Sequence, residues 1–234
     1  MRNIAIIPAR SGSKGLKDKN ILELKGRPLI DYTIRAALDS GCFDEVMVST
    51  DSQLYADISV KCGASVPFLR SAETSSDTAG SWDVVREVLR NYEALGKTFD
   101  TFMLLQPTSP LRTHQDIRNA YALFNEKQAN SVIAMCQVKD SPAAAYQIPE
   151  SLSVVEVINN NPYKNTRRQD IPKFYKTNGA IFLSRVDFFL ETGNIFLEKS
   201  YCSIMDEFSS VDVDTLLDFE IVKSIMELKE AGKL

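Results

Sequence analysis

The chain has 234 residues, of which 44% are hydrophobic and 25% charged, and its formal net charge is −4. This is an ordinary globular composition, and the length allows one large domain or a domain with a subdomain. The mild acidity argues against a general nucleic-acid-binding protein, and no apolar run approaches the roughly 20 residues that a membrane helix needs. Because no signal-peptide pattern follows Met1, the expected location is the cytoplasm, with no membrane partner.

Short apolar runs alternate with amphipathic segments up to about Val138. Strands are predicted from Ile4 onward and at 46–48, 63–68, 102–105 and 131–138, and helices at 29–38, 53–62, 82–95 and 115–126. This alternation predicts an α/β fold with a mostly parallel sheet flanked by helices. Ligands bind beyond the carboxyl ends of such strands. The loops expected at that edge are 10–20, 50–51, 70–81 and 106–112.

The pattern changes between Lys139 and Thr177, where helical periodicity is absent and Pro, Asn and Gln appear. We expect strands and loops that leave the main sheet there, with a strand-like piece at 153–158. An apolar strand is then predicted at 178–183, a helix at 185–190 and a closing amphipathic helix at 216–229.

A basic loop follows the first strand. Between Arg10 and Arg27 there are six Lys or Arg residues and two acids, a local balance of +4 in an acidic chain. Gly12 and Gly15 let the backbone approach a ligand, backbone N–H groups can cradle phosphate oxygens, and lysines supply point charges. The loop is therefore predicted to bind phosphate. The alternative is a surface loop whose lysines only aid solubility.

The spacing of this loop matches neither the ATPase P-loop nor the dinucleotide fingerprint G-x-G-x-x-G, which argues against a redox Rossmann enzyme. The four cysteines are widely spaced and form no zinc pattern, so free thiols in a reducing compartment are expected. The single histidine, His114, lies among polar residues and is expected to be solvated instead of catalytic.

Two acids stand two residues apart near the end of the chain, at Asp212 and Asp214. In an extended segment such residues project to the same side. Paired carboxylates suit Mg²⁺, which takes oxygen ligands and keeps several waters and substrate phosphates. The alternative is that Asp214 caps the last helix while Asp212 is solvated.

Five motifs occur in one order along nearly the whole chain. They are IPARSGSKGLKDKN at 7–20, LLQPTSPLR at 104–112, RRQDIP at 167–172, NGAIF at 178–182 and VDVDT at 211–215. Together they resemble the acylneuraminate cytidylyltransferases, the CMP-sialic acid synthetases. The resemblance implies a Rossmann-like nucleotidyltransferase fold, with one domain over residues 1–234, an inserted dimerisation arm at 139–177 and a homodimer.

The activity that the resemblance implies joins CTP to a nine-carbon 2-keto sugar acid (a nonulosonic acid), giving CMP-sugar and pyrophosphate with Mg²⁺ as cofactor. The anomeric hydroxyl of the acid attacks the α-phosphate. Such a transfer needs positioning and charge neutralisation more than a protein nucleophile. That requirement agrees with a chain that has one histidine and many basic groups.

The resemblance also assigns residues. Those that would bind CTP are Arg10, Ser13, Lys14, Lys19, Asn20, Arg70, Asp77 and Ser81. Lys19 would lie close to the reacting phosphates. Gln106 and Arg168 would contact the sugar acid, Arg168 through the carboxylate of the acid. Asp212 and Asp214 would hold Mg²⁺, with Asp212 expected as ligand or base.

The chain departs from the family near the sugar. Some members carry a lysine shortly after the dipeptide that leads into the arm, where this chain has Ala143–Ala145, and a tyrosine is frequent at the position of Phe182. The acid is therefore either a sialic-type acid or another nonulosonic acid such as legionaminic acid. A transferase for a different base and a non-catalytic nucleotide-binding protein are the remaining alternatives.

Overall fold

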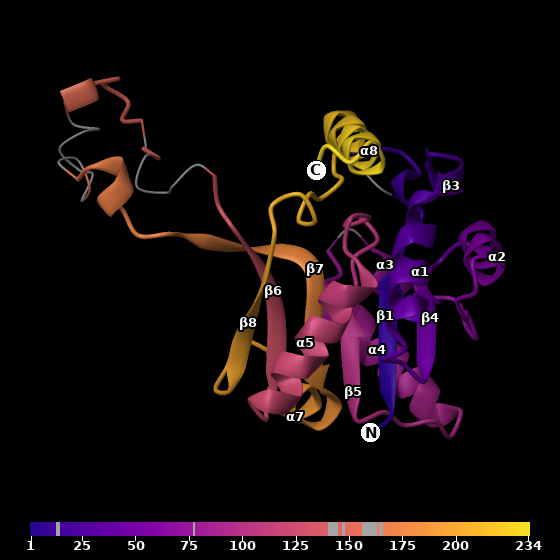
Figure 1. Cartoon of the computed structure of the whole chain (residues 1–234). Helices are drawn as coiled ribbons and strands as arrows, with labels where there is room; N and C mark the ends of the chain where they lie inside the picture. Colours follow the sequence, from indigo (N-terminus) through magenta and orange to yellow (C-terminus); the bar gives the residue numbers. More distant parts are fainter. Residues whose placement is uncertain (13–14, 77, 140–144, 147, 156–162, 164–165) are drawn as a thin grey trace.

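The computed structural model describes residues 1–12, 15–76, 78–139, 145–146, 148–155, 163 and 166–234. Its centre is a six-stranded sheet with the strand order β4-β1-β5-β7-β6-β8 (Figure 1). The strands are β1 (Asn3–Pro8), β4 (Glu45–Ser49), β5 (Thr101–Leu104), β6 (Ser131–Gln137), β7 (Tyr175–Arg185) and β8 (Ser200–Met205). A small pair, β2 (Glu23–Leu24) with β3 (Arg27–Pro28), lies outside this sheet.

The direction of one strand differs from that of its neighbours. β1 runs parallel to β4 and β5, and β6 runs parallel to β8, whereas β7 is antiparallel to both β5 and β6. The predicted mostly parallel sheet is therefore confirmed. The reversal of β7 was not predicted, because an apolar run does not encode strand direction.

The strand predicted at 63–68 is wrong. Ser65 alone pairs with β4, through a parallel bridge to Met47. The Ser65 N–H donates to the Val46 carbonyl, and the Ser65 carbonyl accepts from the Val48 N–H. The next donor in the ladder would be residue 67, which is a proline without an N–H, so the pairing stops.

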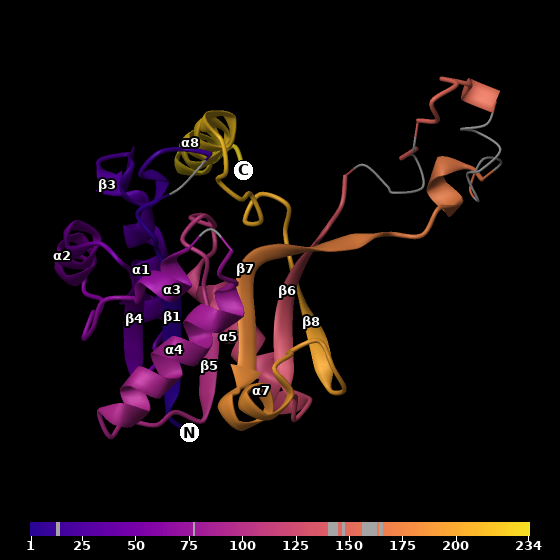
Figure 2. The same cartoon turned by 180° about the vertical axis from the view of Figure 1, so that it is seen from behind.

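Helices cover both faces of the sheet. One face packs against α1 (Leu29–Ser40), α2 (Gln53–Lys61) and α5 (His114–Glu126). The other face packs against α4 (Ser81–Ala94) and α7 (Val186–Thr192), which lie in front of the sheet in Figure 2. A short helix, α3 (Ala72–Ser75), lies within the predicted polar loop. None of the helices in the described ranges is long and apolar enough to cross a membrane.

Local sequence sets the helix ends. Thr113 begins α5 by accepting the Asp116 N–H, while the Asp116 carboxylate accepts the Thr113 N–H at 2.8 Å, a reciprocal cap. Gly41 ends α1 at φ +65°, a left-handed conformation that favours glycine.

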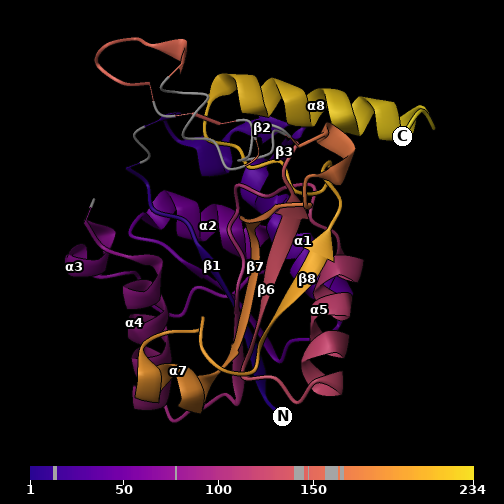
Figure 3. The same ribbon diagram turned by 90° about the vertical axis from the view of Figure 1, so that its left-hand side faces the viewer.

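The last helix, α8 (Leu216–Glu230), crosses the edge of the sheet where the parallel strands end, at the top of Figure 3. Its buried face packs in a separate apolar cluster with Leu24, Leu29 and Val213. The cluster holds the 211–215 segment between α8 and the start of α1, and so places the acidic pair beside the basic loop.

β6 and β7 lead away from the sheet into a projecting segment, which we call the arm (residues 139–174; Figure 1). Within its described parts, η3 (Arg168–Asp170) is a short 3-10 helix. The strand expected at 153–158 is wrong at Val154 and Val155, which are helical, and residues 156–158 lie outside the described ranges. Ile148, Leu152, Val154 and Val155 are all exposed.

Candidate active site

The loops that follow β1 and β5, together with the 70–81 segment, meet the 211–215 segment and enclose a cleft of about 630 Å³, which we call the loop cleft. It lies at the edge of the sheet that the sequence predicted for a ligand. The predicted site residues that line it are Arg10, Lys19, Asn20, Arg70, Ser81, Gln106, Asp212 and Asp214. Residues that are up to 204 positions apart in the chain (Arg10 to Asp214) are thus brought to one cavity.

The basic loop is fixed at both ends by acids. The Ser11 N–H and hydroxyl both donate to the Asp51 carboxylate, each at 2.9 Å. The Tyr55 hydroxyl donates to Asp18 Oδ1 at 3.0 Å. A Cβ at Gly15 would lie 2.8 Å from the Asp214 carbonyl oxygen, so glycine there lets the loop pass against the acidic segment.

Lys19 joins the basic loop to the acidic pair. Its Nζ donates to Asp214 Oδ1 at 2.7 Å and to the Val213 carbonyl at 3.1 Å. The Lys19 side chain is 17% exposed and that of Asp214 is 70% exposed, so the ammonium group is held while the carboxylate faces solvent. The contacts hold the Lys19 ammonium group at the wall of the loop cleft, paired with the Asp214 carboxylate.

Two arginines and an asparagine add to that wall. Arg70 is buried, and its guanidinium donates to the Ser49 hydroxyl at 3.0 Å and the Ser49 carbonyl at 2.6 Å. Burial lowers the pKa of Arg70 to about 10, so it remains a cation at neutral pH. Arg10 donates to the Ser76 carbonyl at 3.3 Å, and the buried Asn20 donates to the Arg10 carbonyl at 3.4 Å.

Asp212 is the less exposed member of the acidic pair. Burial raises its pKa, the Thr108 hydroxyl lowers it, and the Asp214 charge raises it further. Its Oδ1 atom is buried and has no hydrogen-bond partner in the described structure. An unpaired carboxylate oxygen beside a second carboxylate is a donor set that fits Mg²⁺. Among the described residues no group of three or more His, Cys, Asp or Glu could hold a metal alone, so substrate oxygens would have to complete the shell.

A second cleft, of about 780 Å³, lies between the bases of β6 and β7 and the start of α8, and we call it the arm-side cleft. Its charged lining consists of two lysines, Lys139 and Lys176, and three acids, Glu207, Asp212 and Asp218. Lys139 pairs with Glu207 at 3.2 Å. Gln106 and Asp212 line both clefts. These two side chains therefore mark the junction at which a ligand in one cleft meets a ligand in the other.

Four predicted site residues receive no structural test. Ser13, Lys14 and Asp77 lie outside the described residues. The backbone of Arg168 belongs to η3 in the arm, and its side chain is outside the described part of the structure. Its predicted contact with a sugar acid stays a prediction.

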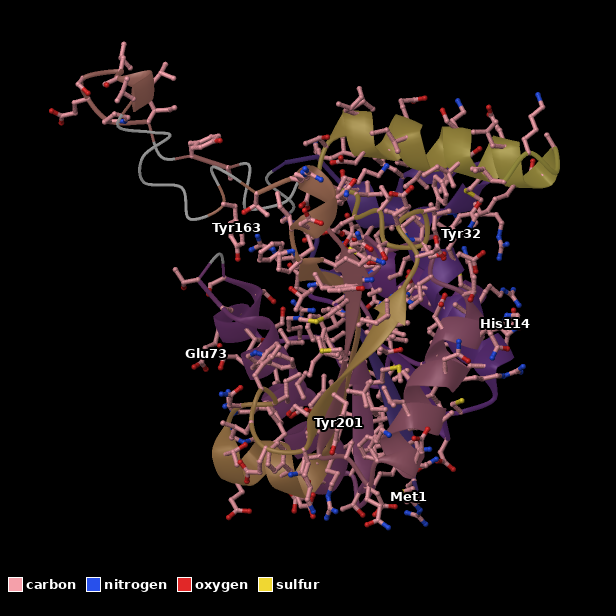
Figure 4. The ribbon with its side chains drawn as sticks, turned by 60° about the vertical axis from the view of Figure 1, so that its left-hand side comes forward. Met1, Tyr32, Glu73, His114, Tyr163 and Tyr201 are labelled. Atoms are coloured by element: carbon pink, nitrogen blue, oxygen red, sulfur yellow. The ribbon has the colours of Figure 1, made fainter. Side chains whose placement is uncertain are left out.

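Sequence reasoning missed two residues that contribute to the loop cleft or lie behind it, Thr108 and Arg112. Thr108 faces Asp212, and its position directly after β5 in the 106–112 turn was the available signal. Arg112 is buried behind the same turn, where no pattern predicts a buried cation. His114 is exposed at the start of α5 and lines neither cleft, on the opposite side of the molecule from Glu73 (Figure 4).

The family model for cytidylyltransferases matches residues 4–231. An N-acylneuraminate cytidylyltransferase of Streptococcus agalactiae is 39% identical over 94% of this chain and 52% of its own length. This chain thus spans about half the length of that relative. A CMP-N,N'-diacetyllegionaminic acid synthase of Legionella pneumophila is 35% identical over 98% of both chains, and a pseudaminic acid cytidylyltransferase of Campylobacter jejuni is 32% identical over 97% of both.

The fold has a solved counterpart. A CMP:2-keto-3-deoxy-manno-octonic acid synthetase complexed with CTP superposes with a TM-score of 0.73 at 18% identity, covering 98% of this chain and all of that one. Since the fold, the family model and the relatives agree along nearly the whole length, the chain belongs to the cytidylyltransferase family.

Proposed function

We propose that this protein transfers the cytidylyl group of CTP to a nonulosonic acid, giving CMP-sugar and pyrophosphate. The observation that carries the proposal is the junction formed by Gln106 and Asp212, which line both clefts. The loop cleft holds CTP in this proposal, and the arm-side cleft holds the acid. The two reacting groups, the α-phosphate and the anomeric hydroxyl, then meet between these side chains.

Within the loop cleft, Arg10, Lys19 and Arg70 neutralise the phosphates of CTP. Arg70 is held by hydrogen bonds to Ser49 before any ligand arrives, so its guanidinium needs little reorganisation on binding. The anomeric hydroxyl of the acid gives its proton to the Asp212 carboxylate and its oxygen attacks the α-phosphorus. The bond between that phosphorus and the oxygen bridging to the β-phosphate breaks, and the electrons leave with pyrophosphate. Lys19 supplies positive charge close to this developing negative charge.

We further propose that Asp212 and Asp214 hold Mg²⁺. The unpaired Oδ1 of Asp212 and the solvent-facing carboxylate of Asp214 support this role. With Mg²⁺ held by these carboxylates, the Lys19 ammonium would be available to the phosphates of CTP. The ion would add positive charge at the triphosphate.

The proposed assembly is a homodimer formed through the arm. The exposed apolar side chains Ile148, Leu152, Val154 and Val155 support it, because a projecting segment that exposes such residues favours a partner surface. A second copy of this chain is the proposed partner, and the cytoplasm, where CTP is available, is the proposed location. A shift from dimer to monomer in Leu152→Asp, measured by light scattering, is the expected result.

The test of the activity is a turnover screen that combines CTP, GTP or UTP with each of several nonulosonic acids. The quantity measured is the release of pyrophosphate. Turnover with CTP alone is expected. Pyrophosphate release with GTP but not CTP would remove the proposal, and tight CTP binding without turnover on any acid would favour a non-catalytic nucleotide-binding protein.

Two acids are the first candidates for that screen. A sialic-type acid is indicated by the streptococcal relative at 39% identity. A legionaminic acid is indicated by the Legionella relative, whose whole length matches this chain. The ratio of kcat/KM for the two acids decides between them.

A further inference from the structure

Arg112 is a buried cation without an anionic partner in the described structure. It is 2% exposed, and its Nε and Nη2 atoms are buried with no hydrogen-bond partner there. Burial lowers the pKa of Arg112 to about 9, so the group stays protonated at neutral pH. The nearest acid, Asp116, is committed to the cap of α5. A charge placed in this way is costly unless its contacts offset the desolvation.

The contacts of Arg112 converge on the junction between the clefts. Its Nη1 donates to the Ala180 carbonyl at 2.7 Å and to the Gln106 carbonyl at 3.2 Å. One guanidinium therefore ties the backbone that follows β5 to the middle of β7. Of the two residues whose carbonyls accept from Arg112, Gln106 is the one that lines both clefts.

Gly179 holds the same glutamine from the other side. It has φ +76°, and a Cβ at this position would overlap Oε1 of Gln106. The Gln106 amide therefore lies directly against the backbone of Gly179, in space that only glycine leaves open. The Asn178 carboxamide fixes this part of β7, since its Oδ1 accepts the Ala180 N–H at 3.1 Å and its Nδ2 donates to the Ser210 hydroxyl at 2.9 Å.

We propose that Arg112 and Gly179 are positioning residues for Gln106: together they aim its amide into the arm-side cleft, where it contacts the acid. The inference rests on the proposed function, because it takes the acid as the ligand of the arm-side cleft. It assigns to Arg112 an effect on the acid and none on CTP, whose phosphates are held by other cations in the loop cleft.

A purely architectural role is the competing explanation. It predicts that loss of Arg112 lowers stability and disturbs both substrates together. Arg118, on α5, provides a matched control. Like Arg112, it donates to two backbone carbonyls, those of Asp39 at 2.8 Å and Ser40 at 2.9 Å. It lines neither cleft.

The experiment measures the KM of the acid at saturating CTP, kcat, and the Kd of CTP by calorimetry. We expect Arg112→Met to raise the KM of the acid roughly 10- to 30-fold and to leave the Kd of CTP within about twofold, with Arg112→Lys recovering part of the loss. Gly179→Ala, which displaces Gln106 without removing the cation, should give the same separation of the two constants. Arg118→Met should lower the Tm and leave both constants unchanged.

If Arg112→Met raises the KM of the acid and the Kd of CTP by the same factor, or leaves the KM of the acid unchanged, the positioning role is wrong. The activity of the wild type is unaffected by that outcome. If Arg112→Met does not fold, Arg112→Lys and Gly179→Ala carry the same test. Failure of the wild type to turn over any acid with CTP is a different outcome, which removes the proposed function and this inference with it.

Discussion

The loop cleft and the arm-side cleft share two side chains but are built differently. The wall of the loop cleft consists of charged groups that hydrogen bonds already hold, such as Arg70 on Ser49 and Lys19 on Val213. The arm-side cleft is bounded by the bases of β6 and β7, where the chain leaves the sheet, and its Lys176 has no ion pair in the described structure.

This difference parallels what the relatives have in common. The names of these relatives agree on the cytidylyl or CMP group and differ in the acid, which is neuraminic, legionaminic or pseudaminic. A fixed cleft suits the common substrate, because held charges are preorganised. A cleft at the base of an inserted segment suits the variable one, because its lining can change without disturbing the sheet. The following changes test whether the two clefts act separately.

The largest effect is expected at the junction. Asp212→Asn should lower kcat about 10²- to 10³-fold, because it removes one of the two carboxylates proposed for Mg²⁺ and leaves an amide where a charged oxygen stood. The measurement is the rate of pyrophosphate release across a magnesium titration. Asp187→Asn is the matched control, since that aspartate pairs with Arg185 far from both clefts. Equal rates in wild type and Asp212→Asn would remove the metal role.

A smaller loss of activity, which affects the use of CTP and not of the acid, is expected for Lys19→Met. The kcat/KM for CTP should fall about 10²-fold, since the change removes the cation fixed beside the triphosphate. Lys25→Met is its control, because Lys25 pairs with Glu230 on the surface and such pairs contribute little. Initial rates at varied CTP give the comparison. If Lys25→Met lowers kcat/KM for CTP by the same factor, the effect comes from the net charge of the protein and not from the position of Lys19.

The arm-side cleft is tested by Lys176→Met. We expect the KM of the acid to rise about 5-fold with the KM of CTP unchanged, since an ion pair of an exposed lysine such as Lys176 contributes up to about 1 kcal/mol. Lys223→Met on α8 is the control, as Lys223 lies near Glu220 and lines neither cleft. A change in the KM of CTP instead would show that the clefts do not act separately.

The smallest effect concerns stability and the turn that leads to the acidic pair. Asp206 accepts the Ser209 N–H at 2.8 Å and the Ser209 hydroxyl at 2.7 Å. Burial alone would raise the pKa of Asp206, but these hydrogen bonds outweigh it and leave the pKa lowered. A lowered folded-state pKa stabilises the fold above the unfolded value of about 3.9, and the contribution is lost as the pH falls through the folded value.

Asp206→Asn should therefore reduce the free energy of unfolding by about 1 kcal/mol at pH 7. The difference from wild type should shrink once the pH falls below about 4. Urea denaturation at several pH values provides the measurement. A difference that stays constant down to pH 3 would contradict the assigned charge effect.

Much of the fold could be predicted from local sequence patterns. Apolar runs and helical periodicity located the helices and most strands, because each of those elements buries one face or both faces within a short stretch of chain. β8 was missed because it lies at the edge of the sheet and its side chains are only partly buried. The direction of β7 and the failed strand at 63–68 depended on pairing partners far along the chain, which periodicity does not report.

The site also divides into features that local sequence predicts and features that depend on tertiary contacts. Strand ends predicted that the loop with Lys19 and the turn with Gln106 would share one edge, since the carboxyl ends of parallel strands meet there. The resemblance, not the strand pattern, added Asp214 to this site. The contact of Thr108 with Asp212 and the tie from Arg112 to Ala180 could not be predicted. Both depend on tertiary distances that no local spacing encodes.

The single reversed strand has a consequence for how such a chain can vary. Because β7 runs against its neighbours, β6 leaves the sheet and β7 re-enters it at the same edge, so the arm is a hairpin-like detour. Residues added to or removed from the detour leave the pairing of β6 with β7 unchanged from Ser131 to Ile133. The sheet can therefore keep its register while evolution lengthens, shortens or exchanges the segment that leads out of the arm-side cleft.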